Sequence, residues 1–203
     1  MNLLMLGVLW IVWCTMHSLL IARPVTGNLQ RLLGGRFKYY RLFYNLTAIL
    51  TLMPLLRLTW QLRGGMVFAW QGYWQILRFL LLATAGWLFW AGARRYDMGY
   101  FLGIRQIRSG TAHILLSETE EFSTTGVFGL TRHPWYLGSI LLLWSILPEY
   151  SIADLMVSTL LSIYIVIGTF LEERKLLAEY GDAYRRYQHQ VPMFLPWIKL
   201  KNK

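Results

Sequence analysis

Three adjacent residues, Arg132-His133-Pro134, stand immediately before an apolar run in the last third of the chain. Proline is favoured at the first position of a helix, so Pro134 predicts a helix start with His133 near its N-cap. Free backbone N–H groups and the helix dipole favour an anion there, and Arg132 adds a cation that can bind a carboxylate in bidentate fashion. The simpler interpretation is that Arg132 meets lipid headgroups and that His133 only caps the helix.

A pair of acids, Glu172 and Glu173, directly follows the uncharged run 155–171. One of these carboxylates is expected to hold a cation, or a ligand hydroxyl or amine, while its neighbour pairs with Arg174 or Arg186. The simpler interpretation is a solvated helix end. Charged groups at such a boundary are costly and usually mark a functional site, so the sequence predicts a binding site here.

The two motifs should lie close together, because a short loop joins the runs 136–147 and 155–171 into a hairpin. An anion-binding end beside a cation-binding end suits a zwitterionic ligand. S-Adenosylmethionine is such a ligand, since it carries a carboxylate and a sulfonium cation. Aromatic side chains such as Tyr136 can hold a sulfonium by cation–π attraction.

The elements that position these motifs are membrane helices. Apolar residues make up 56% and aromatic residues 16% of the 203 positions, which is too apolar for an ordinary soluble domain. A spanning helix needs about 20 mostly apolar residues. The sequence predicts an all-α, polytopic bundle of five membrane helices in a single domain, residues 1–203, with a hairpin of the last two and a cytoplasmic cofactor pocket. The apolar runs are 3–22, 42–56, 74–93, 136–147 and 155–171.

The helices are expected at about 3–22, 40–60, 74–95, from Pro134, and after the turn at 148–150. Pro54 is a candidate kink in the second. The basic segment 24–38 is a candidate for a short interfacial helix, and the long connection 96–131 is expected to be folded. After residue 172 the last helix is expected to continue into the cytoplasm, where apolar and aromatic residues recur at helical spacing, namely Leu176, Leu177, Tyr180, Tyr184 and Tyr187.

The net charge of +10 follows a topological pattern. Seventeen of the twenty basic residues fall in 23–41, in 94–132 and from Arg174 onward. The positive-inside rule therefore predicts an N-terminus outside and a C-terminus and cofactor site in the cytoplasm, in a bacterial inner membrane. No nucleic-acid partner is needed to explain the charge. The first run lacks a basic n-region and is read as a retained helix, with Cys14 as a small packing residue.

The ordered pattern of the C-terminal part resembles the isoprenylcysteine carboxyl methyltransferase superfamily of membrane enzymes that use S-adenosylmethionine. It comprises Thr125-Gly126-Val127-Phe128, Arg132-His133-Pro134-x-Tyr136-x-Gly138, Glu172-Glu173-x-x-Leu176, Tyr180-Gly181-x-x-Tyr184-x-x-Tyr187 and Val191-Pro192-x-x-Leu195-Pro196. The family commonly has Tyr where this chain has Phe128. This chain therefore lacks the tyrosine hydroxyl at that position and any role that depends on it. The resemblance implies that the cofactor and reaction site is lined by His113, Thr124, Thr125, Gly126, Arg132, His133, Tyr136, Glu172 and Glu173.

Two of these residues are expected to act in catalysis: Arg132 by orienting an acceptor carboxylate, and Glu173 by taking a proton. The resemblance further implies a cofactor-binding core at 96–203 and a scaffold with the acceptor side at 1–95. The expected acceptor is a small or lipophilic thiol, carboxylate or amine that reaches the site from the bilayer. No protein partner and no metal are expected.

Two alternatives remain open. Membrane sterol reductases that use NADPH share the Arg-His-Pro-x-Tyr-x-Gly signature, but they commonly have Asn where this chain has Trp135. The N-terminal half, with Met16-His17-Ser18 and Tyr40-Arg41, is similar to thiol S-methyltransferase-like and NnrU-like membrane proteins. Some NnrU-like relatives bind haem, so His17 is a candidate axial ligand. An isolated membrane histidine is more often a hydrogen-bonded structural residue.

Overall fold

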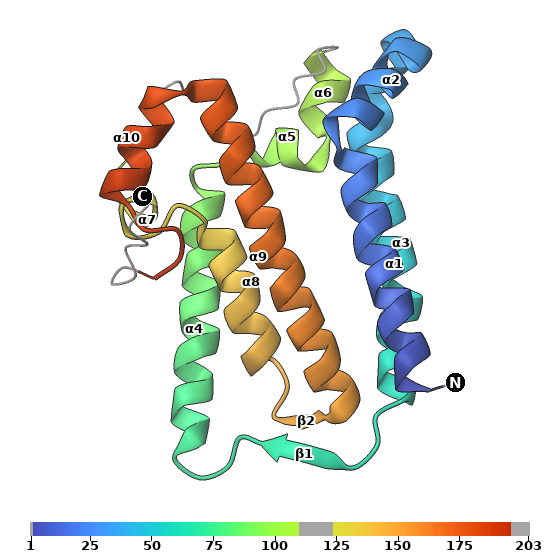
Figure 1. Cartoon of the computed structure of the whole chain (residues 1–203), viewed down its shortest axis with the longest axis vertical. Coiled ribbons are helices and arrows are strands. Elements are labelled where there is room, and N and C mark those ends of the chain that lie inside the picture. Colours follow the sequence, from blue (N-terminus) through green and yellow to red (C-terminus); the bar gives the residue numbers. More distant parts are fainter. Residues whose placement is uncertain (1, 110–123, 196–203) are drawn as a thin grey trace. The chain divides into compact units, whose positions relative to one another are not determined.

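The computed structural model describes residues 2–109 and 124–195, and almost all of its regular structure is helical (Figure 1). Two short strands interrupt the helices, one between α3 and α4 and the other between α8 and α9. In chain order the elements are α1 (Leu3–Ile21), α2 (Arg23–Leu33), the 3-10 helix η1 (Gly34–Tyr39), α3 (Tyr40–Gln61), β1 (Met66–Ala69), α4 (Trp74–Ala93), α5 (Met98–Leu102), α6 (Ile104–Ser109), α7 (Val127–Leu130), α8 (Pro134–Ser145), β2 (Glu149–Ser151), α9 (Ile152–Tyr180) and α10 (Asp182–Gln190).

Four helical stretches are long and apolar enough to cross a membrane, namely Leu3–Ile21, Arg23–Gln61, Trp74–Ala93 and Ile152–Tyr180. They confirm the predicted helices in these regions and make the chain an integral membrane protein. The basic segment after α1 does form a helix, α2, and Pro54 lies inside α3, which continues past it to Gln61. The fourth expected span is shorter than a regular one: α8 has 12 residues, or about 18 Å at the helical rise of 1.5 Å per residue.

The chain divides into two compact units, which are described separately. Unit 1 comprises Met1–Val67, Tyr96–Ser117 and Ser151–Leu160, and unit 2 comprises Phe68–Arg95, Glu118–Tyr150 and Leu161–Lys203. Helix α9 therefore contributes its first part to unit 1 and the remainder to unit 2. The segments of each unit alternate along the sequence, and the predicted roles of residues 1–95 and 96–203 stay predictions.

In unit 1, α1 packs along α3. Leu6, Trp10 and Cys14 recur every fourth residue and form a buried stripe on α1, as the helical period requires. The indole N–H of Trp10 donates to Oγ1 of Thr59 over 3.0 Å. A hydroxyl on one helix therefore satisfies an indole on the other, and such polar contacts help to hold helices together where no water competes.

A second polar contact in unit 1 joins the end of α3 to the start of α9. Nε of Arg63 lies 2.8 Å from Oδ2 of Asp154, which is buried. The same carboxylate oxygen accepts hydrogen bonds from the backbone N–H and the hydroxyl of Ser151, each at 2.8 Å. The Asp154 carboxylate thus satisfies free groups at the first turn of α9, where an acid is favoured by the helix dipole.

In unit 2, α8 packs antiparallel against α4 (Figure 1). At one end the indole N–H of Trp135 donates to the carbonyl of Phe89 over 3.1 Å. At the other end Arg78 donates from Nε to the carbonyl of Ser145 and from Nη2 to that of Ile146, at 2.9 and 3.1 Å. A cation at a helix C-terminus satisfies the last carbonyls and the dipole together.

Close approach of α4 and α8 depends on Gly92. A Cβ atom at this position would lie 2.4 Å from Nε1 of Trp135. We expect Gly92→Ala to displace the indole and to destabilise the fold by about 1–3 kcal/mol, the usual cost of overpacking. The measurement is the thermal unfolding midpoint of the purified protein in detergent.

Gly86 provides the matched control on the same helix, since nothing lies within 4 Å of a Cβ atom built there. Gly86→Ala should leave the midpoint unchanged or raise it, because alanine is the better helix former by about 1 kcal/mol. Equal midpoints for the two variants would show that Trp135 does not pack on Gly92.

Candidate functional site

One carboxylate, that of Glu173, accepts hydrogen bonds from two segments of unit 2, the start of α8 and α10. Its Oε1 accepts from Nε of Arg132 at 2.9 Å, and from Nε2 of His133 and the hydroxyl of Tyr184 at 2.6 Å each. Its Oε2 accepts from Nη2 of Arg132 at 2.7 Å and from Nε2 of Gln188 at 2.6 Å. We call these five residues the clasp. The carboxylate has about four lone-pair positions, so five donors occupy its accepting capacity.

The clasp is buried. The side chains of Arg132 and Glu173 are each 7% exposed, and they form a bidentate pair of the kind that gives strong, directional hydrogen bonds. Nη1 of Arg132 donates in addition to the carbonyls of Gln188 and Val191. The guanidinium thus has its charge compensated by the carboxylate, and its Nη1 is used by the backbone at the end of α10, as a buried ion pair requires.

Two turns bring the clasp residues together. Pro134 is the first residue of α8 and His133 its N-cap, as the sequence predicts. At the other side, α9 ends at Tyr180 and the chain reverses at Gly181, whose φ of +53° favours glycine. The predicted continuous cytoplasmic helix is therefore broken, and α10 folds back so that Tyr184 reaches the carboxylate of Glu173.

Two tyrosines of α10, one of them in the clasp, belong to a buried cluster. Tyr184 and Tyr187 pack with Val191 in a buried cluster, and the hydroxyl of Tyr187 donates to the carbonyl of Phe128 at 2.8 Å. Burial raises the pKa of the Tyr184 phenol well above its ordinary value, and its hydrogen bond to Glu173 raises that pKa further. Burial likewise raises the pKa of Tyr187. Both phenols therefore stay protonated and act as donors.

An aromatic face adjoins the clasp. The rings of His133 and Tyr136 stack with their centroids 5.5 Å apart and an interplanar angle of 10°. Tyr136 lies in the first turn of α8 and is half-buried, whereas the His133 ring is fixed through Nε2 by Glu173. The clasp thereby sets the position of the surface on which Tyr136 rests.

A polar edge formed by Thr124, Thr125 and Gly126 precedes α7, and all three residues are exposed. Nη2 of Arg95 donates to Oγ1 of Thr125 at 2.9 Å, which links this edge to the end of α4. The carbonyl of Thr124 approaches Gly129 so closely that a Cβ atom there would collide with it. The turn is therefore compact and presents exposed hydroxyl and guanidinium groups.

The sequence-predicted residues divide into those that meet in the clasp and those that do not. Arg132, His133 and Glu173 come together, with Tyr136 stacked beside them, whereas His113 lies outside the described residues. Glu172 is half-buried, and no described residue hydrogen-bonds to its carboxylate. The expected partners Arg174 and Arg186 are both exposed; Glu173 pairs with Arg132 because that guanidinium is the buried one.

Three contributors escaped the sequence reasoning as site residues: Tyr184, Gln188 and Arg95. The spacing of Tyr184 and Tyr187 indicates a helical face, but only the reversal at Gly181 directs that face at Glu173. Gln188 lies one turn after Tyr184, which was the available signal. Arg95 carried only a topological meaning in the sequence.

Removing the charge of Glu173 tests the clasp. We expect Glu173→Gln to destabilise the protein by about 3–5 kcal/mol, because it leaves Arg132 buried without a counter-charge. The measurement is the thermal midpoint in detergent, together with the rate at which protease cuts within α10. Glu172→Gln is the matched control on the preceding residue and should change neither value substantially. Similar losses in both variants would contradict the assignment of the hub to Glu173.

Comparisons with known proteins find a family match to this part of the chain. Residues 112–191, which contain the whole clasp, match a family model described as protein of unknown function DUF1295. No solved structure matches the chain significantly.

Several curated relatives share one name. Methanethiol S-methyltransferase 1 of Bradyrhizobium diazoefficiens is 32% identical over 151 residues, which is 71% of this chain and 51% of the relative. Methanethiol S-methyltransferase of Mycobacterium tuberculosis is 31% identical over 154 residues, 74% of this chain and 62% of the relative. That of Crocosphaera subtropica is 34% identical over 104 residues, 49% and 38% respectively.

The chain spans about half the length of the curated relatives that it matches. The matches support the resemblance that the sequence motifs indicate, which is to the isoprenylcysteine carboxyl methyltransferase-like superfamily of membrane proteins.

Proposed function

We propose that this protein transfers a methyl group from S-adenosylmethionine to a small apolar thiol of the methanethiol class. The observation that carries the proposal is the similarity to methanethiol S-methyltransferases across 71% and 74% of the chain. It narrows the acceptor classes predicted from the sequence, because a thiol is the acceptor in the names of these relatives. Neither the NADPH-reductase nor the haem alternative is favoured by the relatives reported above.

The residues of unit 2 fit such a cofactor in chemical type. The exposed guanidinium of Arg95, bonded to Thr125, suits a carboxylate or ribose hydroxyls. The half-buried ring of Tyr136 offers a face to a sulfonium. We propose that these groups, with Thr124 and Gly126, hold the cofactor. The bound cofactor supplies an electrophilic methyl group on sulfur.

The geometry of the clasp supports a positioning role for Arg132, His133 and Glu173. Their polar groups are already used within the protein, so direct contact with a ligand would have to displace an existing hydrogen bond. What they do is fix the start of α8 against the end of α9. Methyl transfer is an in-line displacement that depends on the alignment of the reacting atoms. Small displacements of the residues that line the site therefore lower the rate by large factors.

The thiol must lose its proton as its sulfur bonds to the methyl carbon and the carbon–sulfonium bond breaks. Of the two acids at the end of the membrane helix, Glu172 retains full accepting capacity, since no described residue hydrogen-bonds to it. We propose that Glu172 takes this proton. The products are then a thioether, S-adenosylhomocysteine and one proton, which Glu172 passes to water.

The test is methyl transfer by the purified protein in nanodiscs, with radiolabelled S-adenosylmethionine and a series of alkanethiols. We expect a volatile thioether from methanethiol. We also expect a KM that falls by up to about fourfold for each added methylene that is buried, which corresponds to about 0.8 kcal/mol. Glu172→Gln should lower kcat while leaving the thermal midpoint unchanged. Transfer to carboxylates or amines without transfer to thiols would overturn the acceptor assignment.

A pair of neighbouring arginines provides the cofactor control in the same assay. Arg95→Gln should raise the KM for S-adenosylmethionine by roughly tenfold, the usual effect of losing one charge-assisted hydrogen bond. Arg94 is also exposed but lies over the Trp90 ring, and Arg94→Gln should leave the KM unchanged. An equal rise in both variants would assign the effect to general positive charge.

We also propose that α8 completes a fifth crossing, although it is short. Its first turn packs on Gly92 near the end of α4. The carbonyl of Pro148, just after α8, accepts from the backbone N–H of Trp70, which precedes the start of α4. The segment from Trp135 to Pro148 therefore extends along α4, which is itself long enough to span.

Five crossings predict that the two ends of the chain lie on opposite sides of the membrane. With the positive-inside rule, a reporter fused before Met1 should be located outside and one fused after Lys203 should be located in the cytoplasm. Without a spanning α8, the four remaining crossings would place both ends of the chain on the same side. Matching reporter locations would therefore rule out a spanning α8.

A further inference from the structure

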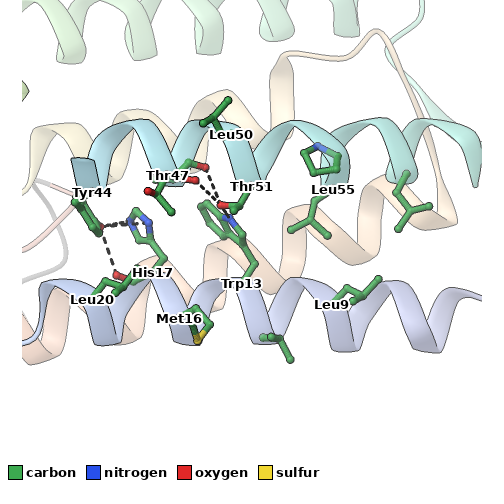
Figure 2. A pocket seen from close by; sticks show the side chains of 14 residues that line it. Leu9, Trp13, Met16, His17, Leu20, Tyr44, Thr47, Leu50, Thr51 and Leu55 are labelled. Carbon is green, nitrogen blue, oxygen red and sulfur yellow. Dashed lines mark hydrogen bonds between the residues drawn. The ribbon is translucent and has the colours of Figure 1, made fainter. Parts of the chain in front are cut away.

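A pocket of about 520 Å³ lies between α1 and α3 in unit 1, away from the clasp residues in the chain (Figure 2). This volume falls in the range of small-molecule sites. Figure 2 shows Trp13 and His17 of α1 opposite Thr51 and Tyr44 of α3. The lining is otherwise mostly aliphatic and includes Leu9, Val12, Met16, Ala48 and Leu50.

Polar side chains along the length of the pocket form hydrogen bonds within the protein. The indole N–H of Trp13 donates to Oγ1 of Thr51 at 3.0 Å, and that hydroxyl donates to the carbonyl of Thr47 at 2.7 Å. The polar atoms in the wall are thus satisfied internally. A polar ligand would gain nothing beside them, whereas an alkyl chain would fill the space by dispersion and apolar contact.

One end of the pocket differs in character. Nε2 of His17 lies 2.7 Å from the hydroxyl of Tyr44, and the Arg41 guanidinium carbon lies 5.7 Å from the centroid of the Tyr44 ring. The guanidinium of Arg41 is half-buried, and its one hydrogen bond to a described residue runs from Nε to the carbonyl of Phe101. Both terminal amino groups therefore remain available for a ligand.

Arg41 has no counter-charge in the described part of the chain. No described carboxylate forms an ion pair with it, and no acid occurs in the sequence before Asp97. A half-buried cation without an anion is unfavourable, and Arg41 stands at the start of a membrane helix, next to the basic segment 23–38. This is the position at which basic residues meet the headgroups of anionic lipids.

We propose that the pocket holds one acyl chain of an anionic phospholipid whose phosphate binds the terminal amino groups of Arg41. From His17 to Leu9 the α1 helix rises about 12 Å, which seats a substantial part of an acyl chain. The outward-facing side chains of Val12, Met16 and Leu50 are 52–71% exposed, so the second chain can remain in the bilayer. His17 and Tyr44 form the polar boundary between chain and headgroup.

The experiment is native mass spectrometry of the full chain, released from nanodiscs that contain equal amounts of phosphatidylglycerol and phosphatidylcholine. We expect one phosphatidylglycerol to be retained in preference to phosphatidylcholine. Ala48→Trp, which fills the pocket, should abolish that retention. Ala83 is exposed on α4, and Ala83→Trp is the matched control that should retain the lipid. Loss in both variants, or in neither, would overturn the pocket as the site.

The headgroup is tested separately. Arg41→Gln should reduce the preference for phosphatidylglycerol by about tenfold, as expected for loss of a charge-assisted contact, and Arg41→Lys should restore part of it. Arg57, exposed on the same helix, is the control, and Arg57→Gln should have no effect. If both lipids are retained equally by the unaltered protein, or displaced equally by free palmitate, the anionic phospholipid assignment is wrong. The readout is lipid retention, so it does not depend on methyl transfer.

Discussion

The arrangement of the C-terminal part depends on the compensation of one buried negative charge. A carboxylate removed from water is tolerated only when cations and hydrogen-bond donors surround it. Glu173 obtains these donors from the start of α8 and from α10, and no one segment could supply them all. The start of α8, the end of α9 and the reversal at Gly181 are therefore not independent features. Each must be in place for the charge to be satisfied.

Much of the fold could be predicted from the sequence because the membrane helices coincide with apolar runs. The bounds of α1, α3 and α4 follow from the length needed to cross a membrane, and the start of α8 follows from Pro134. Charges predicted that Arg132 and Glu173 would lie near each other. Their direct ion pair was not predicted. In the sequence, nearer charged residues such as Arg174 are equally good candidate partners for Glu173, and only burial in the folded protein distinguishes them from Arg132.

The remaining differences have local physical causes. The expected continuous last helix breaks at Gly181, because that residue adopts a positive φ that helix periodicity cannot reveal. Helix α8 is short because its apolar run, 136–147, is itself short, and residues 146–151 leave the helix to form a turn and a strand. The role of Arg95 was hidden for another reason: a basic residue at the end of a membrane helix is already explained by topology, so its contact with Thr125 had no separate signature.

The reversal at Gly181 has a consequence for the order in which the protein assembles. Tyr184 and Gln188 are only 11 and 15 residues from Glu173, whereas Arg132 is 41 residues away. Contacts between near neighbours in sequence close small loops and form quickly, while distant ones wait on the larger closure. The α9–α10 corner can therefore form as a local unit that already shelters the carboxylate, and it presents a preformed acceptor to the cation at the start of α8. Because the chain reverses at Gly181, Glu173 meets its nearby donors first and its counter-charge, Arg132, afterwards.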